Sequence, residues 1–186
     1  MMTTVSLQDA LLDSAREVFE TMVFMAMENA SDDTTSLGET TLLGSITFKG
    51  SLEGCLGVCC DEACARTIAA NMLGMLSPDE LGENDISDAM GEIANMVMGA
   101  VKARIQKEVG TIEVSIPSVV QGRELRNSLG EGSGQVKVRV NIEEQYRAGR
   151  WSNGQRCYAF FEIDKASRKI AAWRYEGTNN TCVIIP

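Results

Sequence analysis

The chain has 186 residues, of which 44% are hydrophobic, and its 26 acidic and 17 basic side chains give a formal net charge of −9. This length allows one domain of ordinary size, or two halves of a duplicated one, with enough apolar residues for a core. The acidic balance excludes nucleic acid as the main partner, because binding to phosphates requires a concentration of Lys and Arg that the sequence lacks.

Two absences narrow the class of protein further. The sequence has no histidine, which excludes Ser–His and Cys–His catalytic pairs and most zinc hydrolase sites. It also has no apolar run of about 18 residues that could span a membrane, and its first residues lack the basic-then-apolar pattern of a signal peptide. We therefore expect a cytoplasmic protein with no membrane contact.

The first 40 residues predict a helix followed by a loop. Ser6 can cap a helix over residues 7–27, in which apolar residues recur every three or four positions. The polar segment 28–40 is typical of a loop.

A strand pair and a second helix follow. Residues 42–50 and 54–60 predict two strands joined by a turn with glycine at both ends. Asp61 can cap a helix over residues 62–75.

Four of the six cysteines lie in the sequence CLGVCCDEAC, at positions Cys55, Cys59, Cys60 and Cys64. Their spacing differs from the C-x2-C pairs of most thiolate metal sites. In a strand, Cys55 and Cys59 share one face and Cys60 points to the other. We expect small, buried, reduced thiols; a metal or iron–sulfur site is the alternative.

A long helix occupies the middle of the chain. Ser77, Pro78 and Glu80 form a helix-start signal, and a helix is predicted over residues 85–107, with Gly110 just past its end. Its acidic residues come early and its basic residues late, which suits the helix dipole.

The remaining sequence is mainly of strand type, apart from a polar, glycine-rich loop over residues 123–134 and a turn over 164–168. The predicted strands are 111–117, 135–142, 156–163, 169–175 and a short closing strand at 181–186. The order of elements indicates two related halves. We expect an α/β fold of the α+β type, with a largely antiparallel sheet and long helices on one face.

One stripe of the long helix carries polar residues. At 100° per residue, Asp88, Glu92 and Asn95 lie close together, and Gly99 and Lys102 extend the stripe. A solvated helix face would explain the acidic residues. It does not explain Asn95, because asparagine competes for backbone hydrogen bonds in a helix interior.

The pattern Asp88-x3-Glu92-x2-Asn95-x21-Pro117 is similar to the signature of the CheC/CheX/FliY phosphatases of bacterial chemotaxis, (Asp or Ser)-x3-Glu-x2-Asn-x21-Pro. The segments ITFKGSLEGCLGV and ARTIAANMLGM also resemble the strand–turn–strand–helix unit of that family. The resemblance extends over about residues 7–164.

This resemblance implies a CheC-like fold of two pseudo-repeated halves and a phosphatase that acts on the phospho-aspartate of CheY-like receiver domains. CheC carries two copies of the signature, and CheX carries one, in its second half. Here the first-half counterpart is Asp13, Glu17 and Glu20, with an acid where the asparagine belongs. The chain therefore resembles CheX more closely, which also implies a homodimer.

The resemblance assigns roles to the residues of the signature. Asn95 would position the attacking water, and Glu92 would pair with a lysine of the receiver. Mg²⁺ would come with the receiver, so no cofactor or metal of the chain's own is expected. The resemblance assigns substrate binding to three further residues, Asp88, Gly99 and Lys102. It assigns a structural role to Pro117.

Two other functions stay open at this point. One is a non-catalytic module that binds receivers or flagellar switch proteins, and the other is a cysteine-based redox or metal protein. We expect residues 1–165 to form the CheX-like domain. Residues 166–186 depart from the family and would form an added edge hairpin, or else a partner-specific surface or a changed dimer contact.

Overall fold

The computed structural model describes residues 4–29, 40–75, 77–127, 133–144, 155–164, 174–178 and 181–185. The helices are α1 (Thr4–Val18), η1 (Phe19–Val23), α2 (Glu62–Leu73), η2 (Pro78–Glu80) and α3 (Glu83–Val109). The strands are β1 (Met25–Asn29), β2 (Thr41–Gly50), β3 (Gly54–Asp61), β4 (Ile112–Val114), β5 (Ser118–Asn127), β6 (Ser133–Glu144), β7 (Gln155–Asp164), β8 (Arg174–Thr178) and β9 (Thr181–Ile185).

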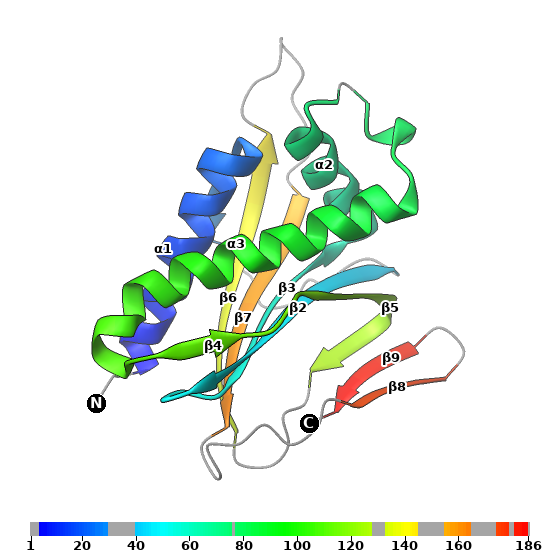
Figure 1. Ribbon diagram of the computed structural model, residues 1–186. Helices are drawn as coiled ribbons and strands as arrows, with labels where there is room; N and C mark the ends of the chain where they lie inside the picture. The colour runs from blue at the N-terminus through cyan, green and yellow to red at the C-terminus, as the bar shows by residue number, and fades with distance from the viewer. Residues whose placement is uncertain are drawn as a thin grey trace.

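The strands form one mixed sheet in the order β1-β6-β7-β3-β2-β5-β9-β8, and β4 pairs with β2. Every described pairing is antiparallel except that of β5 with β9, which is parallel. Figure 1 shows α1 and α3 lying across one face of this sheet, with β8 and β9 beyond β5 at its edge. The expected fold class, a largely antiparallel sheet with helices on one face, is confirmed.

The helices and the sheet share one hydrophobic core. Alternate side chains of β2 and β3 point toward the helices, as the pleat of a strand requires. They pack with apolar residues of α1, α2 and α3 into a single cluster. The central members include Ile46, Leu56, Ile93 and Val97, whose exposed fractions are at most 1%.

A glycine brings α3 into direct contact with β2. A Cβ atom at Gly44 would lie 2.5 Å from the carbonyl oxygen of Met90 and 3.3 Å from the Cβ of Ala94. Any amino acid other than glycine would place its Cβ atom where the backbone of α3 lies. Gly44 therefore sets how closely the middle of α3 approaches the strands.

The predicted start of α2 was correct, and the helix ends two residues earlier than predicted, whereas α3 extends two residues beyond the prediction at each end. Asp61 accepts a hydrogen bond from the Cys64 N–H (2.8 Å) at the start of α2. Ser77 accepts one from the Asp79 N–H (3.3 Å), but it begins only the short turn η2. The long helix begins at Glu83, two residues earlier than predicted.

The predicted helix over residues 7–27 was wrong at its C-terminal end. The α-helix stops at Val18, η1 follows, and Phe24 takes a left-handed conformation (φ 58°) that turns the chain. Met25 and Met27 then belong to β1, which pairs with β6, and both are buried. Pairing along the sheet edge outweighs the local helical pattern here.

The predicted loop over residues 123–134 was also wrong at its start. Strand β5 continues to Asn127 because β9 pairs with its polar half, joining Arg123 to Thr181 and Asn127 to Ile184. The predicted turn at 164–168 and most of the strand at 169–175 lie outside the described residues.

The four clustered cysteines are buried thiols, as expected. Cys60 belongs to the helix-side core, and its Sγ lies 3.7 Å from the Sδ of Met90. Cys55 and Cys59 are buried outside that cluster, which agrees with their predicted place on the other face. In the described part of the chain, no three His, Cys, Asp or Glu side chains are arranged to hold a metal ion. No described helix is long and apolar enough to cross a membrane.

Candidate functional site

The polar stripe of α3 faces outward. Asp88, Glu92, Asn95 and Gly99 are exposed, and Lys102 is half-buried. The opposite side of the helix packs on the sheet and on α1 through residues with at most 1% exposure, Met90, Ile93, Val97, Val101 and Ile105. The core therefore fixes the rotation of α3 and presents all five predicted site residues along one line.

The polar groups of this stripe are available to a partner. Among the residues that the structure describes, Asp88, Glu92 and Asn95 form no hydrogen bond or ion pair through their side chains. Gly99 lies one turn beyond Asn95, and no atom outside the adjoining helix backbone lies within 4 Å of the position that its Cβ would take. The surface beside the amide is therefore open.

Pro117 lies against the same helix. A Cβ atom at Gly91 would be 3.6 Å from both Cβ and Cγ of Pro117, and 3.4 Å from Cγ2 of Val119. Gly91 precedes Glu92 directly. The proline ring therefore lies against the turn of α3 that carries the stripe.

The chain around Pro117 contains an extra residue relative to its partner strand. Val114 pairs with Phe48 and Ser118 pairs with Ser45, so three residues lie opposite two. This arrangement is a β-bulge, which turns side chains away from the regular alternation of a strand. The bulge places Pro117 and Val119 toward α3.

Ser115 stabilises this bulge with three hydrogen bonds. Its N–H donates to the Thr47 carbonyl (2.9 Å), and its hydroxyl accepts from the Thr47 N–H (3.1 Å). The hydroxyl also donates to the Ile116 carbonyl (2.8 Å). The sequence prediction missed this role. The available signal was a small hydroxyl residue two positions before a proline in a strand, a combination that favours local side chain–backbone bonding.

Comparisons with known proteins identify a family for this chain. The family model described as "Chemotaxis phosphatase CheX" matches residues 42–141, which include the stripe of α3 and Pro117. The chain belongs to the CheX family. A comparison with curated protein sequences finds no significant match.

Solved structures of this family share the fold. CheX from Vibrio vulnificus is 25% identical, with a TM-score of 0.60 over 85% of this chain and 97% of that one. The CheX–CheY–BeF3–Mg²⁺ complex from Borrelia burgdorferi gives a TM-score of 0.63 at 14% identity, over 89% of this chain and 100% of that one. FliY from Thermotoga maritima gives a TM-score of 0.56 at 18% identity, over 89% of this chain and 93% of that one. The last two likenesses concern the fold alone.

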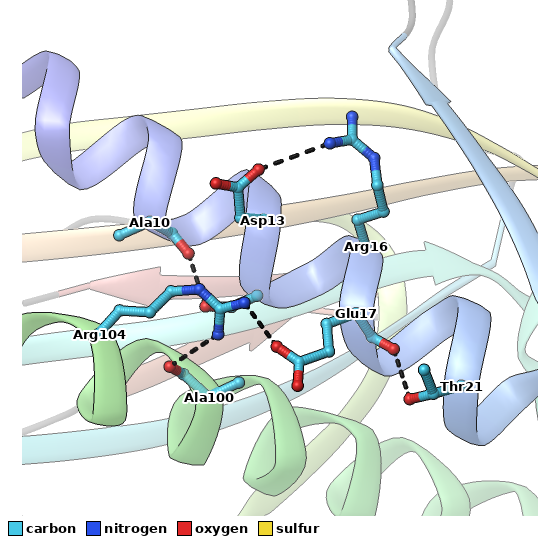
Figure 2. A network of polar contacts seen from close by, with 8 residues as sticks. Ala10, Asp13, Arg16, Glu17, Thr21, Ala100 and Arg104 are labelled. Atoms are coloured by element: carbon cyan, nitrogen blue, oxygen red, sulfur yellow. Dashed lines mark hydrogen bonds and ion pairs between the residues drawn. The ribbon is translucent and has the colours of Figure 1, made fainter.

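In this CheX-family chain, the described segment from α1 to η1 carries no second open stripe. Asp13 pairs with Arg16 at 3.5 Å. Figure 2 shows Glu17 pairing across the helix contact with Arg104 of α3, which also donates to the Ala100 carbonyl at 3.2 Å. Glu20 lies beyond the end of α1, in η1. The counterpart of Glu92 is thus held in an ion pair, and the counterpart of Asn95 lies in the π-helical turn η1 and not in the α-helix.

Charge is distributed unevenly along α3. Apart from Glu108, its acids lie in the first ten residues, and its basic side chains lie in the last eight, an arrangement that complements the helix dipole. Asn95 lies between the acidic and basic parts. A partner that docks on the stripe would meet Glu92 on one side of the amide and Lys102 on the other.

Proposed function

We propose that this protein is a phosphatase that hydrolyses the phospho-aspartate of a CheY-like receiver domain. The observation that carries the proposal is the outward presentation of Asn95 on α3, one turn after Glu92, in a chain of the chemotaxis phosphatase family CheX. The structure from Borrelia burgdorferi, a CheX in complex with CheY, BeF3 and Mg²⁺, supports a receiver as the partner.

The reaction requires little beyond a well-placed water molecule. The water oxygen attacks phosphorus while the bond between phosphorus and the aspartate oxygen breaks, which yields a free carboxylate and inorganic phosphate. An acyl phosphate is already activated, and its transfer has a loose transition state, so a strong base is not needed. A chain without histidine can therefore catalyse this step.

Asn95 supplies the positioning. Its amide oxygen accepts a hydrogen bond from the water, and its NH₂ group donates to a neighbouring oxygen. Fixing the water in line with the leaving carboxylate lowers the barrier by several kcal/mol, because the entropy of bringing the reactants together is no longer lost in the transition state. Glu92 pairs with the receiver's lysine and aligns α3 over the acyl phosphate.

The other assignments complete the proposal. Asp88, Gly99 and Lys102 border the docked receiver, and Pro117 supports the helix. Mg²⁺ belongs to the receiver, and the chain holds no cofactor of its own. In keeping with the family resemblance, we propose a cytoplasmic homodimer.

Phosphate release from phosphorylated receivers, with and without the protein, tests this function. Asn95→Ala should lower kcat for the stimulated reaction about a hundred-fold or more, by comparison with the loss of other positioned groups. The receiver dissociation constant and the circular dichroism spectrum should change little, because the side chain is exposed. Retained turnover in this variant would contradict the mechanism. A wild-type chain that binds receivers without hydrolysis would instead be the non-catalytic interaction module.

A further inference from the structure

Ile116 is the most exposed of the large hydrophobic side chains that the structure describes, with 86% of its surface accessible. Single exposed apolar residues are common on proteins, so exposure alone indicates nothing. The surroundings of Ile116 are unusual in two respects, its rigidity and its position beside α3.

The backbone at Ile116 is held in place from both sides. Ser115 forms three hydrogen bonds, two with Thr47 and one with the Ile116 carbonyl. Pro117 follows, and a residue before proline is restricted to extended conformations. The side chain is β-branched and therefore stiff at χ1. An apolar group fixed in this way loses little conformational entropy when a partner covers it.

The bulge also fixes where Ile116 lies. The ring of Pro117 packs at the position of Gly91 on α3. On a helix, residues three and four apart are neighbours. Gly91 is three residues after Asp88 and four before Asn95, so the proline borders both. Ile116 directly precedes this proline in the connection between β4 and β5.

We propose that Ile116 is an apolar anchor for the receiver domain, which docks over Asn95 and covers this side chain. This inference rests on the proposed function. The receiver is the chosen partner because a protein that places its acyl phosphate at Asn95 must extend over the edge of α3 that Pro117 and Ile116 form. Val114, 42% exposed and two residues earlier, continues the same apolar edge.

The anchor acts on binding and not on the chemical step. Burial of Ile116 contributes equally before and during hydrolysis, because its side chain has no polar group that could reach the water or the phosphoryl oxygens. A contact of this kind lowers KM and leaves kcat unchanged. Ile116 is therefore a specificity-determining residue, separate from the positioning role of Asn95.

The test measures kcat and KM with the phosphorylated CheY-class receiver that gives the strongest stimulated phosphate release. Affinity for the same receiver loaded with BeF3 and Mg²⁺ is measured in parallel. Ile116→Ser should raise KM and the dissociation constant about ten-fold to a hundred-fold, the effect of burying one aliphatic side chain. It should leave kcat and the thermal midpoint unchanged. Ile116→Val should restore most of the affinity.

Leu73→Ser is the matched control. Leu73 is an aliphatic side chain of the same composition, 56% exposed at the end of α2 and outside the β4–β5 connection. The proposal is overturned if Ile116→Ser binds the receiver as the wild type does, or if Leu73→Ser weakens binding equally. Asn95→Ala distinguishes the two proposals. If Asn95→Ala retains turnover, the proposed function is contradicted. If Ile116→Ser leaves KM unchanged, only the proposed role of Ile116 is contradicted.

Discussion

At the scale of single residues, the candidate site lowers the stability of α3, and packing in the core compensates for this loss. Asn95 and Gly99 together make α3 less stable than alanine would by about 1.5 kcal/mol, because both are poor residues for a helix interior. Their neighbours on the opposite side, Ile93 and Val97, are fully buried and hold the helix in place. A helix held by tertiary packing can therefore present an amide and an open surface to another protein.

Glu92 offers a test of the pairing with the receiver. Glu92→Ala should raise the dissociation constant for the BeF3-loaded receiver about ten-fold, and Glu92→Lys should raise it further, because two cations would then face each other. The fold should be unaffected, since the side chain is exposed. Titration by isothermal calorimetry measures both. Glu108→Lys makes the same change in net charge near the other end of α3, so equal weakening there would show a general charge effect and contradict the pairing.

Residue-level reasoning from the sequence succeeded where helical periodicity decides the outcome. The outward direction of Asp88 and Asn95 follows from the buried positions on the same helix. The contact between Pro117 and Gly91 could not be foreseen in this way, because it depends on how two distant segments pack. The exposure of Ile116 was missed for the same reason: a bulge changes which face of a strand a residue occupies.

At the scale of elements, the approach of α3 to β2 depends on Gly44. Gly44→Ala places a methyl group 2.5 Å from the Met90 carbonyl oxygen, so the helix must move away from the sheet. Overpacking of this kind costs about 1–3 kcal/mol. We expect a lower urea midpoint and also a lower kcat, since a shift of α3 displaces Asn95 from the receiver.

Gly99→Ala is the control for stability. It makes the same chemical change where no atom lies within 4 Å, so it should stabilise the protein by about 1 kcal/mol. Equal urea midpoints for the two variants would show that the close helix–strand contact does not exist in solution.

Element prediction from sequence was accurate for segments with strong local signals. The strand pair β2–β3 and the cap at Asp61 were recognised because a glycine-flanked turn and a capping carboxylate act locally. The end of α1 and the length of β5 were misjudged. In both places a distant strand decides the structure: β6 pairs with β1, and β9 pairs with the polar half of β5.

At the scale of the whole molecule, the order of strands was beyond sequence reasoning. Strands β6 and β7 return to lie between β1 and β3, so that the first and second halves of the chain interleave in one sheet. The alternating pattern of residues 135–142 predicts a strand but does not indicate which strands pair with it. The candidate site depends little on this order, because its residues come from α3 and from the connection that follows it.

The C-terminal strands allow a test of where the domain ends. Strands β8 and β9 form an antiparallel pair that joins the sheet at its edge, through β5. Removal of residues 166–186 should therefore leave the circular dichroism spectrum unchanged and kcat within a few-fold of the full chain. It should also leave the outer edge of β5 unpaired, and unpaired edges promote association between chains. Size-exclusion chromatography with light scattering should show larger species than the full chain forms at the same concentration. Loss of cooperative unfolding in urea would instead mean that the extension is part of the domain.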